Sequence, residues 1–565
     1  MKVVIFLLKY SWGLLLLAIG ASIVAGLSNV LLVALINVTI TSRRINFAHV
    51  LWGFVGLIVI VAGARALASL ILTRLTQNAT LELRMRLARQ ILATPARRLE
   101  KIGGASLLAA LTTDISTLTN GLLSIATVCL QSTLLIGCLG YLAWLSGTVF
   151  LGVFVFIVLT MSLYQLGVNL SWRFLKLARE QHDSLFKHFR SLTEGTKELK
   201  LHRRRREAFL AGVLYPTSSS LRRHQLIGSG IFTATGAWGQ LMFFVLIGLV
   251  IFGLPLLPFS DPLLIIGYVF IILYITVILE VLSAMLPNLS NAAVALQKIE
   301  SLGLSLTAAA ASEAPFDSSA FGDSCETLEL VGVTHSYHRE GEDSTFVLGP
   351  LSLSFRSPSL VFVTGGNGSG KTSLVKLLTG LYQPEQGEVK LNGIPVTTKN
   401  RESYLQFFSA VFSDFYLFEV LLGLEQPKLD MQARDYLAEL QLERQVSIKD
   451  GRLSTTELSQ GQRKRLALLT AYLEDRPIYV FDEWAADQDP LFKEVFYREI
   501  LPALKKRGKL CFVISHDDRY YDLADHVVKL ENGLQVPTAQ SWHRPRLDSI
   551  QPESGNVLAF KEADD

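Results

Sequence analysis

The sequence predicts a multi-domain membrane protein in which a six-helix transmembrane domain precedes an α/β domain. Half of its 565 residues are hydrophobic and only 18% are charged. The mean hydropathy of +0.36 exceeds that of a soluble domain of this length. Long apolar runs occur up to about residue 300, whereas the sequence after about residue 325 has the mixed pattern of an α/β domain.

Six apolar segments are long enough to cross a bilayer, which takes roughly 20 residues of helix. They are residues 12–36, 50–70, 122–144, 149–168, 231–254 and 263–286. The predicted domains are a transmembrane domain at 1–303, a linker rich in Ala, Ser and Gly at 304–326, an α/β domain at 327–533 and a polar tail at 534–565.

Charge in the loops predicts how this membrane domain is oriented. The loops after the second and fourth segments are long and rich in Lys and Arg. Since such loops stay in the cytoplasm, both termini are predicted to be cytoplasmic. Arg43 and Arg44 fall in the first outside loop, but two charges do not outweigh two large basic loops. Helical patterning at residues 81–91 predicts that the membrane helices continue well into the cytoplasm.

Charges elsewhere narrow the range of partners. The net charge of +4 indicates no nucleic-acid partner. The basic run at residues 203–206 is interpreted as a solvated face that helps to fix topology. Glu280 lies within the last apolar segment, where an ionisable group is costly unless it faces water or a partner. It is a candidate for the substrate cavity, and the alternative is a structural salt bridge, for which Arg65 is one partner.

A phosphate-loop pattern lies at the start of the α/β domain. Residues 365–372 fit G-x-x-x-x-G-K-[ST], between a strand-like run at 360–364 and a helix-like run at 373–381. The predicted nucleotide-binding residues are Gly365, Gly366, Asn367, Gly368, Ser369, Gly370, Lys371, Thr372 and Ser373. Lys371 is expected to neutralise the β- and γ-phosphates of ATP, and the Thr372 hydroxyl to ligate Mg²⁺.

Later residues supply the rest of a hydrolytic site. An apolar run at 478–483, predicted to be a buried strand, ends in the two acids Asp482 and Glu483. We expect Asp482 to hold Mg²⁺ through water and Glu483 to polarise the attacking water. His516 follows another apolar strand, where its ring could contact the γ-phosphate. Tyr337 is placed to stack on adenine, or else belongs to the core.

A second phosphate cradle is predicted at the start of a helical run covering residues 463–473. Its members are Ser459, Gln460, Gly461 and Gln462. Their amide groups and the Ser459 hydroxyl would face phosphate, because a helix N-terminus favours anions.

Along the chain the phosphate loop is followed by the second cradle, then by Asp482 and Glu483, and then by His516. This order resembles the ATPase domain of ABC transporters. Six spans before one ATPase domain resemble the half-size ABC exporters. Further stretches resemble the bacterial cyclic-peptide exporters, which include transporters of pyoverdine precursors, syringomycin-type lipopeptides and lasso-peptide microcins. The matching stretches are residues 194–202, 408–415, 482–490 and 515–518.

The resemblance implies the cofactors ATP and Mg²⁺ and adds Asp487 to the catalytic residues Glu483 and His516. Ser413 stands where most members have a Gln that touches Mg²⁺, and its shorter reach makes it a weaker metal candidate than Thr372 and Asp482. The family's signature motif corresponds here to residues 458–462, Leu-Ser-Gln-Gly-Gln. Gln460 replaces the usual second glycine of this signature.

The resemblance also implies how the chain works. In this family the signature of one copy caps the nucleotide held by another, so the simplest machine is a homodimer. A heterodimer with a similar half is the alternative.

The function it implies is ATP-driven export of a cyclic or non-ribosomal peptide-like metabolite, such as a siderophore precursor, lipopeptide or microcin. Transport runs from cytoplasm to periplasm across a bacterial inner membrane by alternating access. The partners are a second copy, the cargo and membrane lipid, with periplasmic or outer-membrane export components left open. The alternatives are a flippase of a lipid or lipid-linked precursor, and an ATP-sensing membrane regulator without cargo.

Overall fold

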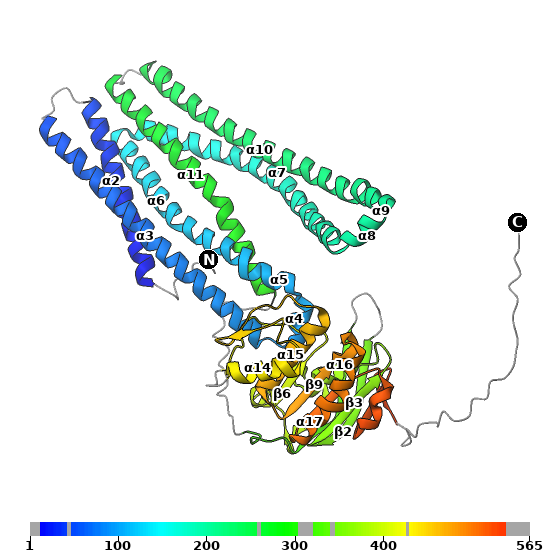
Figure 1. Cartoon of the computed structure of the whole chain (residues 1–565). Helices are drawn as coiled ribbons and strands as arrows, with labels where there is room; N and C mark the ends of the chain where they lie inside the picture. The colour runs from blue at the N-terminus through cyan, green and yellow to red at the C-terminus, as the bar shows by residue number, and fades with distance from the viewer. Residues whose placement is uncertain are drawn as a thin grey trace, which may run out of the picture. The chain divides into compact units, whose positions relative to one another are not determined.

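The chain forms two compact units in the computed structural model, which describes residues 12–41, 47–256, 262–302, 320–338, 345–424 and 429–537 (Figure 1). One unit comprises Met1–Leu92 and Ile102–Ala309, and the other Ala93–Lys101 and Ala310–Asp565. Arg43, Arg44, most of the linker predicted at 304–326 and the predicted tail beyond residue 537 lie outside the described residues.

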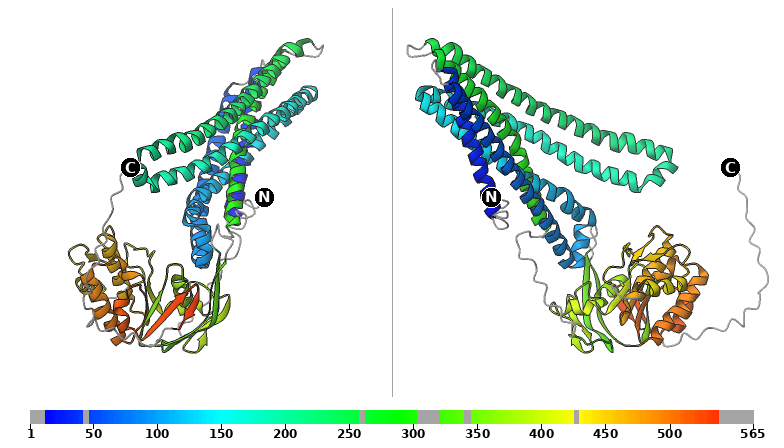
Figure 2. Two further views of the ribbon diagram at one scale, coloured as in Figure 1. Left: turned by 90° about the vertical axis from the view of Figure 1, so that its right-hand side faces the viewer. Right: turned by 60° about the vertical axis from the view of Figure 1, so that its left-hand side comes forward.

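The first unit is built from long helices (Figures 1 and 2). They are α2 (Trp12–Thr41), α3 (Phe47–Ala93), α5 (Gly104–Ala109), α6 (Ile115–Leu145), α7 (Gly147–Glu194), α8 (Thr196–Leu201), α9 (Arg203–Ala208), α10 (Tyr215–Gly248) and α11 (Pro262–Ser301). Short π-helical or 3₁₀ turns interrupt them at Ala110–Asp114, Phe209–Leu214, Leu249–Gly253 and Leu254–Leu256. Within the described residues, six helices are long and apolar enough to cross a membrane, which confirms the predicted number of membrane helices.

Several of these helices are longer than a bilayer requires. α3 has 47 residues and α7 has 48. At a rise of about 1.5 Å per residue, each is about 70 Å long, against roughly 30 Å of hydrocarbon core. α7 and α10 run side by side as far as α8 and α9 (Figure 2). The predicted helical extensions are therefore present.

Small residues let α7 and α10 approach each other closely. A Cβ added to Gly167 would lie 2.4 Å from the Thr235 hydroxyl oxygen, so nothing larger than glycine fits there. One turn further along α7, the buried Ser171 hydroxyl donates to the Gly228 carbonyl at 2.8 Å. Such contacts are the usual basis of helix packing in a membrane, where the hydrophobic effect does not drive helices together.

The second unit contains two main sheets. The strands are β1 (Thr327–His338), β2 (Thr345–Arg356), β3 (Ser359–Gly365), β4 (Gln386–Leu391), β5 (Ile394–Pro395), β6 (Phe408–Val411), β9 (Ile478–Asp482), β10 (Leu510–Ile514), β11 (His526–Glu531) and β12 (Leu534–Val536). β2-β1-β4-β5 form a four-stranded antiparallel sheet, and β12-β11-β3-β10-β9-β6 form a six-stranded sheet. β12 lies beyond residue 533, the predicted end of this domain, because it pairs with β11.

The six-stranded sheet positions the candidate site. β3, β10, β9 and β6 are parallel neighbours in that order. Their nearly continuous apolar runs are buried, as expected for strands covered on both faces. Since carboxyl ends of parallel strands share one edge of a sheet, the residues that follow these four strands meet there.

Helices cover this sheet and complete the unit. They are α12 (Lys371–Leu378), α13 (Arg401–Leu405), α14 (Leu429–Glu439), α15 (Gln460–Glu474), α16 (Pro490–Val495) and α17 (Leu501–Lys506), with helical turns at Trp484–Asp487, Phe496–Ile500 and Asp518–Leu523. The described part of the segment before α15 forms α14 and a short hairpin of β7 (Ile448–Lys449) and β8 (Arg452–Leu453).

The second unit also includes a helix from the loop between the second and third spans, α4 (Ala96–Ile102). The Glu100 carboxylate lies 2.7 Å from the Lys376 ammonium group, and Arg97 lies 2.9 Å from Glu385. A piece of the membrane half of the sequence is thus held on the α/β unit by two ion pairs.

Candidate functional site

The loop after β3 has the backbone that a phosphate cradle needs. Gly368 and Gly370 have φ angles of 76° and 101°, in the region that favours glycine. At Gly370 a Cβ would lie 2.8 Å from the Leu348 side chain, so no larger residue fits. The other predicted members are Gly365 at the end of β3, Gly366, Asn367 and Ser369 in the loop, and Lys371, Thr372 and Ser373 at the start of α12.

Two side chains of this loop have polar groups suited to phosphate. Lys371 is 6% exposed and donates to the carbonyls of Gly365 and Gly366 at 3.0 Å each. Burial lowers the pKa of Lys371, while two nearby carboxylates act in the opposite sense. The Ser369 hydroxyl is buried and has no hydrogen-bond partner among the described residues. Phosphate oxygens would give both groups acceptors.

Thr372, Ser413 and Asp482 converge beside the loop. The hydroxyls of Thr372 and Ser413 lie 3.4 Å and 3.3 Å from the same Asp482 oxygen, Oδ2. Burial, and then the charge of Glu483, raises the pKa of the Asp482 carboxyl, and hydrogen bonds from Ser413 and Thr372 oppose this. Oδ1 is buried without a partner in the part of the chain that the structure describes. Mg²⁺ in nucleotide sites is usually held by one or two carboxylates and by the phosphates of the substrate. A carboxylate oxygen with free lone pairs is suited to be one of these ligands.

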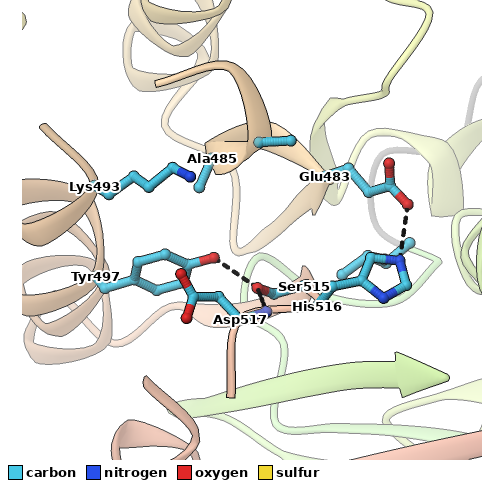
Figure 3. Close-up of a pocket in the computed structure, with 9 residues that line it drawn as sticks. Glu483, Ala485, Lys493, Tyr497, Ser515, His516 and Asp517 are labelled. Carbon is cyan, nitrogen blue, oxygen red and sulfur yellow. Dashed lines mark hydrogen bonds and ion pairs between the residues drawn. The ribbon is translucent and has the colours of Figure 1, made fainter. Parts of the chain in front are cut away.

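Glu483 and His516 face each other at the carboxyl ends of β9 and β10 (Figure 3). His516 Nε2 lies 3.3 Å from Glu483 Oε1, and both side chains are partly exposed. They line a cavity of about 300 Å³ with Lys493, Tyr497 and others. An exposed carboxylate beside an imidazole at this edge is an arrangement that can accept a proton from water.

The backbone of Glu483 is held in place by a residue that sequence reasoning missed. Glu483 has a φ of 49°, which is unusual for a residue other than glycine. Lys464 of α15, 3% exposed, donates to the Glu483 carbonyl at 2.7 Å and pairs with Asp487 at 2.8 Å. Asp487 therefore contacts the lysine that positions Glu483, and among the described residues no hydrogen bond or ion pair joins Asp487 to the Glu483 side chain. In sequence Lys464 stands between two arginines, a pattern typical of an exposed helix face.

The second predicted phosphate cradle forms the start of α15. The Ser459 hydroxyl accepts from the Gln462 amide, and the Gln462 side chain accepts from the Ser459 amide, in a capping box. Gln460 is the first helical residue. A Cβ on Gly461 would lie 2.7 Å from the Asp487 carbonyl oxygen, so glycine is required there. Between described residues of this one chain, no hydrogen bond or ion pair links Ser459–Gln462 to the phosphate loop.

Two further predicted residues lie apart from these clusters. Tyr337 is on β1, 41% exposed, and pairs across the sheet with Phe346. Phe346 lies 3.3 Å from the position of a Cβ on Gly370, so Tyr337 is one strand away from the phosphate loop. In the membrane unit, Glu280 lines a pocket and forms no ion pair with Arg65 among the described residues. The alternative of an Arg65–Glu280 salt bridge is therefore wrong for this structure.

Replacing Asp482 with Asn is expected to stabilise the nucleotide-free protein while removing its response to Mg²⁺ and ATP. A buried carboxylate without full hydrogen bonding costs about 1 kcal/mol or more, and the amide avoids that cost. Because the pKa of Asp482 is raised on folding, the cost is present at neutral pH and disappears below its ordinary value of 3.8. Thermal unfolding at pH 7 tests this. A lower melting temperature for D482N, or an unchanged shift with Mg²⁺ and ATP, would contradict it.

Comparison with known proteins finds one matching family in the membrane half of the chain and one in the α/β half. The family described as "ABC transporter transmembrane region" matches residues 6–207, and "ABC transporter" matches residues 348–486. The ATP-binding protein SyrD of Pseudomonas syringae pv. syringae is 36% identical over 523 residues, covering 91% of this chain and 92% of SyrD.

Two other similarities bear on fold and cargo. An ATP-dependent lipid A-core flippase of Alkalilimnicola ehrlichii is 32% identical over 37% of each chain. The solved structure of a bacterial Atm1-family ABC exporter with ATP bound aligns with a TM-score of 0.73 at 15% identity, covering 94% of this chain and 95% of that one. The chain belongs to the ABC transporter family as a half-size exporter, an ATPase coupled to transport that uses ATP with Mg²⁺.

Proposed function

We propose that two copies of this chain form a homodimer that exports a cyclic or non-ribosomal peptide-like metabolite. Export would run from cytoplasm to periplasm across a bacterial inner membrane, with both termini cytoplasmic. The chain is an ATP-driven exporter and a multi-pass membrane protein, and its half-size fold implies dimerisation. The homodimer, the cargo and the orientation are the proposed part.

The dimer is supported by the separation of the two phosphate-binding elements. The phosphate loop and the start of α15 each occur once, and no described bond joins them within one chain. If the Ser459–Gln462 tip of one copy closed on ATP held by the Gly365–Ser373 loop of the other, both elements would contact one nucleotide. ATP would then hold the two ATPase domains together until hydrolysis removed the γ-phosphate contacts.

We assign the following roles within that composite site. Lys371 neutralises the β- and γ-phosphates, and Thr372 and Asp482 hold Mg²⁺, which neutralises phosphate charge when bound. Ser413 donates a hydrogen bond to Asp482. We therefore assign Ser413 to positioning that carboxylate rather than to binding Mg²⁺ directly. Glu483 polarises the attacking water, His516 contacts the γ-phosphate, and Asp487 acts through Lys464. Tyr337 stacks on adenine.

Coupling to the membrane half is supported by α4. Its ion pairs from Glu100 to Lys376 and from Arg97 to Glu385 tie the loop between two spans to the ATPase domain. Lys376 belongs to α12, the helix that starts at the phosphate loop. A movement of that loop on ATP binding or release therefore has a short path to the spans.

The cargo is proposed from the motifs shared with cyclic-peptide exporters and from the similarity to SyrD along nearly the whole chain. Lipid flipping is the second candidate, because a lipid A-core flippase is among the relatives, although over about a third of the chain. An ATP-sensing regulator without cargo is the third, and its ATPase would respond to no ligand.

Reconstitution distinguishes these three functions. We expect cyclic peptides of mixed polar and apolar composition to raise the ATPase rate severalfold and to accumulate inside inside-out vesicles with ATP. Fluorescent phospholipids serve as the flippase control in the same vesicles. Flipping of lipid without peptide uptake would overturn peptide export in favour of the second candidate, and an ATPase that responds to neither would favour the third.

A further inference from the structure

The membrane unit contains a pocket between α7, α10 and α11 that holds a single charged residue. Its volume is about 320 Å³, and its lining includes Tyr164 of α7, Phe232 and Gln240 of α10, and Glu280 of α11. Within the described lining no Lys, Arg or His is present. The pocket therefore carries a net negative charge if Glu280 is ionised.

The Glu280 carboxylate has no hydrogen-bond or ion-pair partner among the described residues, and Glu280 is exposed and lines the pocket. A carboxylate in a membrane span is costly unless water, a cation or hydrogen-bond donors compensate it. The basic group nearest in this direction among the residues of the neighbouring cavity is Arg179, which donates to Asn291 at 3.0 Å. Asn291 lies eleven residues after Glu280 on α11, or about 16 Å along the helix. Arg179 is thus too distant to neutralise Glu280.

Polar residues of α11 continue from this pocket along one face of the helix. Thr276, Glu280 and Ser283 line it, and Pro287 and Asn291 line a neighbouring cavity of about 560 Å³. Their spacing of three or four residues places all five on one face. Pro287 also lacks the N–H that would bond the Ser283 carbonyl, which leaves an extra acceptor between the two cavities.

The two cavities are neighbours, because Phe232 lines both. At about 320 Å³ the first cavity is near the lower limit of pockets for drug-sized ligands, roughly 300 Å³, and a peptide macrocycle is larger than such a ligand. This cavity fits one side chain of a larger molecule whose remainder lies in the second cavity. Tyr164, Phe232 and Phe243 supply aromatic surface beside the carboxylate, and aromatic faces also attract cations.

We propose that the pocket around Glu280 binds a cationic amino group of the cargo, so that the exporter prefers peptide-like molecules carrying a primary amine. This inference rests on the proposed function and narrows its substrate class. Glu280 supplies the counter-charge, Thr276, Ser283 and Gln240 supply hydrogen bonds, and the aromatic rings pack on the neighbouring apolar part of the cargo.

Glycines on α10 make room for such a group and allow an independent test. Gly236 lines the pocket, and a Cβ added there meets no atom within 4 Å. A Cβ at this position therefore enters the pocket without a clash, and valine adds two further methyl groups to the occupied volume. Gly230 lies on the same helix, is equally free of neighbours and lines neither cavity, so Gly230→Val is a matched control.

The experiment compares two forms of one probe in proteoliposomes of phosphatidylcholine: a cyclic hydrophobic peptide with a free lysine side chain, and the same peptide with that lysine acetylated. The readout is the peptide concentration that gives half-maximal ATPase stimulation. Glu280→Gln is expected to raise it about tenfold for the amine form, the loss of one charged hydrogen bond, and to leave the acetylated form unchanged. Glu280→Asp is expected to restore most of the response, and Asp183→Asn, an exposed acid of α7 outside both cavities, to change neither.

Gly236→Val is expected to weaken the response to the amine form, whereas Gly230→Val does not. Equal stimulation by both peptides, with no effect of Glu280→Gln, would overturn the amine preference and leave peptide export standing. A Glu280→Gln variant that weakens both forms equally would also overturn it, because a structural role does not distinguish them. If neither peptide stimulates the wild-type protein, peptide export fails and this inference fails with it.

Discussion

Replacing Glu483 with Gln is expected to lower the ATPase rate by at least about 100-fold, the contribution typical of a general base, and to stop efflux. The amide keeps the size of the side chain beside His516 but cannot accept a proton from the attacking water. ATP should still bind, because the phosphate loop, Lys371 and Asp482 are unchanged. Phosphate release, nucleotide affinity and vesicle uptake measure the three quantities separately.

A matched control separates charge at the site from charge elsewhere in the domain. Glu499 is an exposed acid of the same unit and takes part in no side-chain hydrogen bond or ion pair among the described residues. Glu499→Gln is therefore expected to retain the wild-type rate within about twofold, as surface substitutions usually do. Efflux that persists in the Glu483→Gln protein would refute the assigned role of Glu483.

Mixed dimers are expected to show that each nucleotide site is built from two copies. Lys371→Ala damages the phosphate loop, and Ser459→Arg blocks the signature tip. If one copy carries the first change and its partner the second, both changes fall in the same composite site and the other site stays intact. If one copy carries both changes and its partner none, each site is damaged once.

The expected result is about one vanadate-trapped nucleotide per dimer in the first arrangement and none in the second. Copies with different affinity tags allow each mixed dimer to be purified. A site contained within one chain would give the reverse pattern, since the doubly changed copy would leave its partner intact. A lone chain that hydrolyses ATP at the full rate with Ser459 replaced would likewise contradict the composite site.

The parts of the fold predicted best are those in which local pattern and burial agree. The strands at Ile478–Asp482 and Leu510–Ile514 form where uninterrupted apolar runs indicate them, because a central parallel strand is buried on both faces. The helix predicted at residues 373–381 instead forms as Lys371–Leu378. Its start is moved toward the loop because Gly370, in a left-handed conformation, serves as its N-cap.

The parts predicted least well depend on residues distant in sequence. Lys464 has the sequence context of a solvated lysine, yet it is buried and holds the Glu483 carbonyl. Arg65 has the charge to pair with Glu280, but no ion pair joins the two among the described residues. Neither outcome follows from spacing along one helix, since both depend on how separate elements pack.

From the sequence alone came the number of spans, the order of the ATP-handling motifs and the candidate site residues Lys371, Asp482, Glu483 and His516. This is possible because a bilayer demands a minimum apolar length and phosphate chemistry demands particular groups at fixed local spacing. Only the tertiary structure decided that α4 sits on the ATPase domain, that Asp482 Oδ1 lacks a partner, and that Glu280 faces a pocket. These are through-space relations, and they exist only once helices and strands from distant parts of the chain have packed together.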